Sequence, residues 1–275
     1  MGHFDAPWGN MIRFGPLESF LAVFFCMILL LSVRGGLKHL YDDNDEYKLN
    51  YYFALINLLQ AAILALLYTD DVFTAYVFIE ICTLASTGIL MIRQVGRTTV
   101  AAVRYLIFNL LGSGLFLIGI IILYDITGHL LIPNIAESVT NLVANGEYPV
   151  PLLISASLIT LGLAVKSGLF PFCYWMPDTY GYATTASSSI ISGIVSKIYI
   201  FTSIKMLYRV MGASYATQSH ITDVLFVFGL AGMIIGSLHA IREKNINRMV
   251  AFSSAAQIGY IYAAIGLGTE AGLAA

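Results

Sequence analysis

Long apolar runs, separated by short polar breaks, dominate the chain. Each run is roughly 17–25 residues long, which is the length of an α-helix that crosses the hydrocarbon of a bilayer. The runs are continuous and do not alternate between apolar and polar positions, so a transmembrane β-barrel is excluded. The pattern predicts an all-α polytopic membrane protein. We expect about eight transmembrane helices, at residues 17–33, 51–68, 72–92, 101–124, 151–174, 186–208, 222–240 and 249–268.

Composition agrees with a chain embedded in a lipid bilayer. Apolar residues make up 58% of the sequence and charged residues only 11%, whereas about 25% is usual for a soluble domain. The formal net charge of −2 gives no reason to expect nucleic acid as a partner. Residues 1–275 are therefore expected to form a single membrane domain.

The distribution of basic residues between the breaks predicts the orientation of the helices. One set of breaks holds many Lys and Arg residues, whereas the long break at residues 125–150 on the other side holds none. Basic loops stay in the cytoplasm, so the N-terminus is expected outside a cell membrane (inner or plasma) that the chain crosses several times. The cytoplasmic set is Arg34, Lys38, Lys48, Arg93, Arg97, Arg242, Lys244 and Arg248, and the outer set is Arg13, Lys205 and Arg209.

Three ionisable residues, Glu80, Lys166 and Lys197, fall near the middle of predicted spans. A charge at the bilayer centre costs about 2.5–3.5 kcal/mol, and such residues usually serve a proton or ion pathway. Burial favours the neutral form of an amine and a nearby carboxylate favours its charged form, whereas arginine does not release its proton. The three residues are candidates for a proton relay, and a structural ion pair between helices is the alternative.

Lys166 is followed closely by Gly168 and Pro171. Proline lacks the backbone N–H that would bond to the carbonyl of Ser167, and its ring crowds the preceding turn. We therefore expect the helix to be broken near Pro171. Backbone freed at membrane depth must be buried in protein or face water, and broken helices often mark a transport site. A simple packing kink is the alternative.

Hydroxyl groups precede Lys197 in the stretch ATTASSSIISGIVSK. At helical spacing Ser188, Ser192 and Ser196 share one stripe, and Ser189 lies on the adjacent one. Such a stripe suits a hydrated path to Lys197 and equally suits close helix packing.

His239 ends the seventh run, where it is a candidate proton-loading group or a simple hydrogen-bonding residue. The sequence has no paired histidines at membrane depth, no CxxC motif, no Gly-rich phosphate loop and no nucleophile triad. We expect no cofactor and no metal, and we expect neither redox nor hydrolytic chemistry in this chain.

Four stretches resemble a known family in order and spacing: DDVFTAYVFIEICTLAS, VKSGLFPFCYWMPD, SGIVSKIYIF and KNINRMVAFSSAAQIGY. They are similar to the antiporter-like proton-translocating subunits of complex I, of Mrp-type multisubunit cation/proton antiporters and of membrane-bound hydrogenases. The resemblance implies that Glu80 and Lys166 form a gating pair and that Lys197 receives the proton. Cys173 stands where the family often has His, and Asn247 where it usually has Lys.

The family is built from two inverted five-helix repeats. The resemblance places a leading helix at residues 17–33, the complete first repeat at 51–209 and the start of the second repeat at 222–275, with two leading helices absent. It implies a proton-translocating subunit of a larger complex. The host is either a complex I-like or membrane-bound hydrogenase complex, in which a partner performs the electron transfer, or a multisubunit Na+/H+ antiporter. Another membrane subunit is expected to supply the missing half of the second repeat. A non-conducting structural half-antiporter that seals the membrane arm is the alternative.

Overall fold

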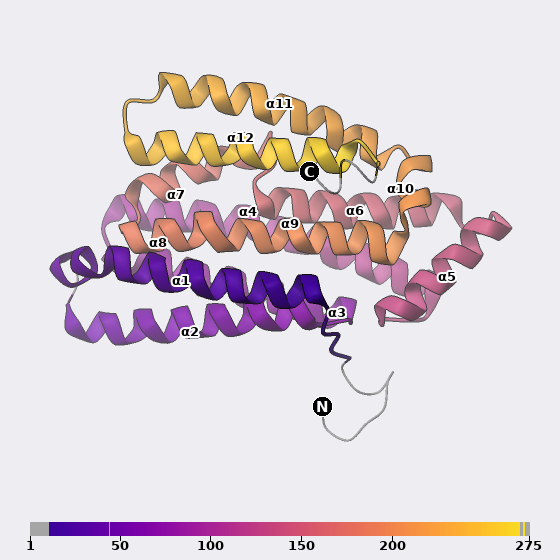
Figure 1. Cartoon of the computed structure of the whole chain (residues 1–275), viewed down its shortest axis with the longest axis horizontal. Coiled ribbons are helices and arrows are strands. Elements are labelled where there is room, and N and C mark those ends of the chain that lie inside the picture. The colour runs from indigo at the N-terminus through magenta and orange to yellow at the C-terminus, as the bar shows by residue number, and fades with distance from the viewer. Residues whose placement is uncertain (1–10, 44, 270–271, 273–275) are drawn as a thin grey trace.

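The computed structural model describes residues 11–43, 45–269 and 272, and these residues are almost entirely helical (Figure 1). The elements are α1 (Pro16–Asp43), α2 (Glu46–Tyr68), α3 (Val72–Leu90), η1 (Met91–Arg93), α4 (Gly96–Thr127), α5 (Ile132–Asn145), α6 (Pro149–Ser167), η2 (Phe172–Trp175), α7 (Met176–Tyr182), α8 (Thr185–Ile190), η3 (Ile191–Val195), α9 (Ser196–Ile204), η4 (Lys205–Met211), α10 (Ala213–Gln218), α11 (Ile221–Arg242) and α12 (Ile246–Gly266).

Eight helical segments in the described part of the chain are long and apolar enough to cross a membrane, as the sequence predicts. Six are single helices, with α3 extended by η1, and two are composite. The fifth span runs through α6, η2 and α7, and the sixth through α8, η3, α9 and η4. The chain is therefore a multi-pass membrane protein. The two ends of the predicted single domain 1–275, including the end of the predicted segment 222–275, lie partly outside the described residues.

The break at residues 125–150 contains a helix that the pattern of long apolar runs does not reveal. In α5, Ile132, Ile135 and Val139 are buried, and the rest of the helix is mostly polar or exposed. Its 14 residues are too few to cross a bilayer, so it differs from a span in both length and pattern. In Figure 1, α5 and α10 lie at the same end of the bundle.

The turn between α2 and α3 is held by segments that are distant in the sequence. The backbone N–H of Asp70 donates to the carbonyl of Met11 at 2.9 Å, and its carbonyl accepts from the N–H of Ile132 at 2.9 Å. Both backbone groups of this buried residue are thus satisfied, as buried peptide groups must be. The turn makes α2 and α3 antiparallel neighbours, as predicted, and fixes the position of the Asp70 side chain.

Close packing between α4 and α6 fixes the height of the broken helix. A Cβ atom on Gly112 would lie 2.8 Å from the carbonyl oxygen of Gly162 and 2.9 Å from Cγ of Lys166. Only glycine allows the two backbones to approach this closely. The hydroxyl of Ser155 also donates to the carbonyl of Gly119 at 2.8 Å. The contact holds the end of α6, and with it Lys166, against α4.

The sixth span contains two π-helical segments, η3 (Ile191–Val195) and η4 (Lys205–Met211). Each wider turn rotates the residues that follow relative to a regular α-helix, and π-turns are frequent at functional sites. Lys197 is the second residue after the first segment, and Lys205 begins the second. Stripes drawn at regular α-helical spacing therefore do not hold across this span.

Candidate functional site

The fifth span is broken at the predicted place. The helix α6 ends at Ser167, and Gly168 follows with a φ of 82°, in the left-handed region that favours glycine. The N–H groups of Gly168 and Leu169 both donate to the carbonyl of Ala164, at 3.1 and 3.0 Å. This cap satisfies the end of the helix one turn before Pro171. The span then continues through η2 and α7.

Lys166 lies in the last turn of α6, and its side chain is fully buried. Its Nζ donates a hydrogen bond to the hydroxyl of Thr83 at 2.8 Å and lies 3.7 Å from Oε1 of Glu80. The ring centroid of Tyr199, on α9, is 5.3 Å from the same nitrogen. The predicted pair of Glu80 and Lys166 is thus brought together between α3, α6 and α9.

The carboxylate stands near the ammonium group without sharing a hydrogen bond with it. Glu80 and Thr83 are three residues apart on α3 and therefore share a face. The hydroxyl oxygen of Thr83 accepts a hydrogen bond from Lys166. Oε1 of Glu80 is buried and accepts no hydrogen bond from the described protein atoms. The C-terminal end of α6 also favours a cation at this position through the helix dipole. Lys166 is therefore stabilised by nearby charge but bonded only to a neutral oxygen.

Further polar side chains are buried around this pair. The hydroxyl of Thr83 lies 3.4 Å from that of Tyr199. Ser86, Tyr105 and Asn109 each have a buried side-chain oxygen without a hydrogen-bond partner among the described protein atoms. Buried polar groups are normally paired, so this cluster is unusually polar for the interior of a membrane protein.

Lys197, the third member of the predicted relay, contacts its own helix. It is partly buried, and its Nζ donates to the carbonyl of Ser192 at 2.6 Å, across the π-turn η3. Tyr199, which faces Lys166, is two residues further along α9, and residues two apart diverge by roughly 200° around a helix. Lys197 therefore lies on a different side of α9 from the Lys166 pair.

The predicted serine stripe crosses the π-helical segment η3. Ser188, Ser189 and Ser192 are partly buried, whereas Ser196 is 1% exposed. The hydroxyl of Ser189 donates to the carbonyl of Thr185 at 2.8 Å, and that of Ser192 donates to the carbonyl of Ser189 at 3.3 Å. These two hydroxyls therefore bond to backbone carbonyls of their own helical segment.

His239 packs between aromatic rings at the end of α11. Its ring centroid lies 5.2 Å from that of Phe252 on α12 and 6.4 Å from that of Tyr174 in η2. This places His239 beside the segment that follows the break. The contacts are those of a packed side chain, and the structure gives no contact from His239 to Glu80 or Lys166.

A second group of buried charges lies at the end of the bundle near α5 and α10, and the sequence interpretation missed it. Lys205 was counted with the loop charges, but it is only 5% exposed, and its Nζ lies 4.0 Å from Oδ1 of Asp70. Arg209 pairs with Glu18 at 2.5 Å. The sequence around Lys205 and Arg209 does not indicate their partners. Asp70 and Glu18 come from distant parts of the chain.

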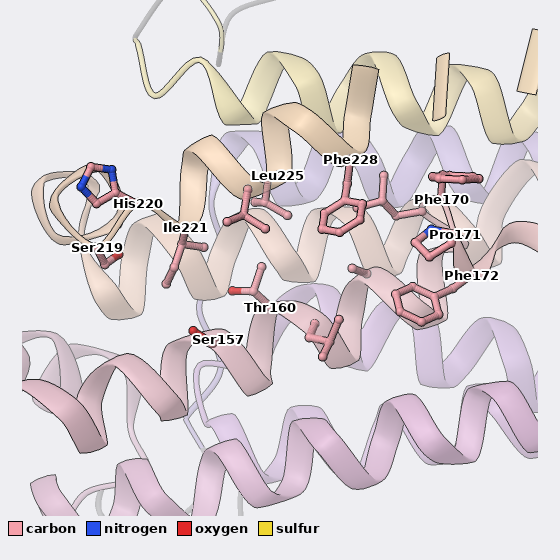
Figure 2. A pocket seen from close by; sticks show the side chains of 14 residues that line it. Ser157, Thr160, Phe170, Pro171, Phe172, Ser219, His220, Ile221, Leu225 and Phe228 are labelled. Atoms are coloured by element: carbon pink, nitrogen blue, oxygen red, sulfur yellow. The ribbon is translucent and has the colours of Figure 1, made fainter. Parts of the chain in front are cut away.

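An apolar groove of ≈ 340 Å³ lies between α6 and α11. Figure 2 shows Phe170, Pro171 and Phe172 at one end and Ser219 and His220 at the other. Its lining includes neither Glu80 nor Lys166, so the groove is separate from the charged site. Among the described residues, no group of three or more His, Cys, Asp or Glu is placed to hold a metal ion.

Comparisons with known proteins agree with this architecture. Residues 69–275 match the family described as "NADH:quinone oxidoreductase/Mrp antiporter, TM". The NADH-quinone oxidoreductase subunit N of Desulforudis audaxviator is 31% identical over 262 residues, which cover 95% of this chain and 51% of that protein. This chain thus spans about half the length of the curated relative that it matches.

Solved structures show the same arrangement of helices. A chain in the membrane-bound sulfane sulfur reductase (MBS), an archaeal respiratory membrane complex, superimposes with a TM-score of 0.82 at 26% identity, over 96% of this chain and 52% of that one. A chain of the Mrp complex from Dietzia sp. DQ12-45-1b gives a TM-score of 0.78 at 26% identity, over 91% of this chain and 45% of that one.

Proposed function

The chain belongs to the NADH:quinone oxidoreductase/Mrp antiporter transmembrane family, and we propose that it is an antiporter-like subunit that moves protons within a larger membrane complex. Its partners are other membrane subunits, of a respiratory complex or of a multisubunit cation/proton antiporter. The segment from α2 to η4 forms the first five-helix repeat, α11 and α12 begin the second, and the N-terminus lies outside the inner or plasma membrane.

The observation that carries this proposal is the buried Lys166 at 3.7 Å from Glu80. At about 4 Å and an effective dielectric constant of about 20, opposite charges attract by roughly 4 kcal/mol. That is close to the cost of about 2.5–3.5 kcal/mol for placing a charge at the bilayer centre. The attraction therefore offsets the cost of burying the charge, so Lys166 keeps its proton while Glu80 is close. Movement of Glu80 away from Lys166 removes this compensation and favours release of the proton.

The proposed relay runs from the Glu80–Lys166 pair to Lys197. Ser86, Tyr105 and Asn109 have unpaired buried oxygens beside the pair, which suits a path that water completes. Because Lys197 lies on another side of α9, its proton passes along the helix rather than directly between the two amines. Ser188, Ser189, Ser192, Ser196 and His239 remain candidate members of the hydrated path.

A non-conducting structural subunit is the competing function. A structural ion pair is strongest when the charged groups share hydrogen bonds at about 2.7–2.9 Å, but Lys166 donates to Thr83 and stays 3.7 Å from Glu80. This geometry favours a site that changes charge over one that only joins helices. High-resolution density for water between Lys166 and Lys197 would support conduction, and a dry, closely packed interior there would support the structural function.

The direct test replaces Lys166 by alanine in the complete host complex, reconstituted in vesicles. We expect Lys166→Ala to abolish proton transport, followed with a pH-sensitive dye, while the complex keeps its subunits. Lys48→Ala is the matched control, because Lys48 forms its ion pair with Asp45 at the start of α2. The complex with this variant should transport protons normally. Normal transport by the Lys166→Ala complex would disprove the relay.

A further inference from the structure

The buried corner formed by Glu18, Asp70, Lys205 and Arg209 lies apart from the predicted relay. Glu18 is in the first turn of α1, Asp70 in the turn between α2 and α3, and the two basic residues are in η4. Asp70 and Lys205 are 0% and 5% exposed. The opposite charges of Asp70 and Lys205 are thus buried together. The desolvation free energy of such a pair is high and is offset only by excellent geometry.

The geometry of the Lys205 pair is not that of a close ion pair. Its Nζ donates a hydrogen bond to the backbone carbonyl of Thr69 and lies 4.0 Å from Oδ1 of Asp70. Both carboxylate oxygens of Asp70 are buried and accept no hydrogen bond from the described protein atoms. In the adjacent pair the charges are closer, because Nη2 of Arg209 lies 2.5 Å from Oε1 of Glu18, although this oxygen also accepts no hydrogen bond from the described protein atoms.

The arrangement around Lys205 repeats the one around Lys166. In both places a buried lysine donates to a neutral oxygen, of Thr83 for one and Thr69 for the other. In both, a carboxylate with an unpaired buried oxygen stands 3.7 or 4.0 Å away. The same three parts therefore occur twice in the chain, once beside the break in the fifth span and once where the sixth span becomes π-helical.

We propose that Lys205 and Asp70 form a second proton-holding site, at the end of the bundle near α5 and α10. This inference rests on the proposed proton transport. When the pair discharges, an N–H bond of Lys205 breaks and an O–H bond of Asp70 forms, leaving a neutral amine and a neutral acid. The distance of 4.0 Å is covered by a rotation of the lysine chain or by one water molecule. The acid then loses its proton to solvent, and the lysine is recharged from within the bundle.

Other charged groups lie around the site. Besides Asp70, they are Glu18, Arg209 and Arg13. The neighbouring elements α5 and α10 add the exposed Glu137 and the partly buried Tyr215, and burial raises the pKa of Tyr215. Arg209 is 32% exposed in its side chain, so the corner reaches the surface beside the site.

The test distinguishes a Lys205 that is needed only for its positive charge from a Lys205 that must release its proton. Lys205→Arg keeps the charge and the donor but does not release a proton. In the assembled complex in vesicles, we expect this variant to keep its subunits and to lose proton transport by about a hundredfold. Lys48→Arg is the matched control and should transport normally, because Lys48 pairs with Asp45 at the start of α2, away from the corner. Normal transport by Lys205→Arg would overturn the proposal.

A double variant covers the case in which arginine does not fit. Lys205→Met with Asp70→Asn removes both charges together, which a buried pair tolerates better than the loss of one. We expect an assembled complex that does not transport. Normal transport, or failure of both variants to assemble, would show that the pair is structural and would overturn the proposal. Lys166→Ala in the same assay tests the proposed function separately, since normal transport by that variant would disprove proton transport through this chain altogether.

Discussion

The Glu80–Lys166 pair and the Glu18–Arg209 pair use the same charges in different ways. Arg209 lies 2.5 Å from its carboxylate, whereas Lys166 lies 3.7 Å from its own and donates to Thr83 instead. Arginine keeps its proton at all relevant pH values, but a buried lysine can lose it. The arginine pair therefore joins α1 to η4 through a permanent charge, whereas the lysine pair contains a group that is chemically able to lose its charge.

Removing the carboxylate from each pair gives the largest predicted contrast. Glu80→Gln takes away an attraction of roughly 4 kcal/mol that keeps Lys166 charged. We expect proton transport by the assembled complex in vesicles to fall at least about tenfold, because 1.4 kcal/mol already changes an equilibrium by that factor.

Glu18→Gln is the matched control for that experiment. It removes the partner of Arg209, which is 32% exposed in its side chain and can turn to solvent. Transport should fall less than in Glu80→Gln, because Arg209 keeps its charge without this partner. Equal losses in the two variants would remove the distinction between the pairs.

Gly112→Ala disturbs the packing that places Lys166. The new Cβ would lie 2.8 Å from the carbonyl of Gly162 and 2.9 Å from Cγ of Lys166. We expect a loss of about 1–3 kcal/mol of stability, as for other overpacked cores, measured as a lower midpoint of thermal unfolding in detergent. Gly114→Ala has open space around it and should change little, so equal shifts would show that α4 and α6 do not depend on the close contact.

Gly168→Ala tests the cap that ends α6 directly after the lysine site. Gly168 has a φ of 82°, and a side chain in this region costs about 1–2 kcal/mol. The unfolding midpoint should fall accordingly. Gly35→Ala, in the helix α1 with nothing near its Cβ, should shift the midpoint slightly upward because alanine favours a helix. A Gly168→Ala protein as stable as the original would argue against a strained cap.

The smallest effect is expected where arginines form pairs near the ends of helices. Asp178 pairs with Arg104 and, at 3.8 Å, with Arg248, and all three side chains are partly exposed. Such pairs contribute about 0–1 kcal/mol. Asp178→Asn should therefore lower the unfolding midpoint only slightly and leave transport unchanged. A large loss of transport would place Asp178 in the proton path and weaken the contrast between arginine and lysine pairs.

The apolar pattern was sufficient to predict the spans and the place of the break. Long continuous runs need only length and hydropathy, and Gly168 with Pro171 specifies an interruption by its own backbone chemistry. The same criteria missed α5, because 14 residues with an apolar stripe at Ile132, Ile135 and Val139 do not form a span. The sequence pattern is thus sufficient to predict the spans and the helix break, because both depend on residues that are close together in the sequence.

The partners within the site were harder to predict. Rarity at membrane depth identified Glu80 and Lys166, and the structure places them together. Thr83 was accessible in principle, since it follows Glu80 by three residues on one helix face. Asp70 was not, because its contact with Lys205 depends on how the turn between α2 and α3 is held by distant segments. The π-helical segment η3, which interrupts the sixth span, likewise gave no sign in the spacing of the serines.

In the proposed relay, Lys166 must release its proton rather than only carry a charge. Lys166→Arg in the complete complex, reconstituted in vesicles and followed with a pH-sensitive dye, tests this directly. A complex that assembles with the arginine but no longer transports protons is the predicted result. Proton transport at the unmodified rate with arginine at this position would show that transport does not require Lys166 to release its proton.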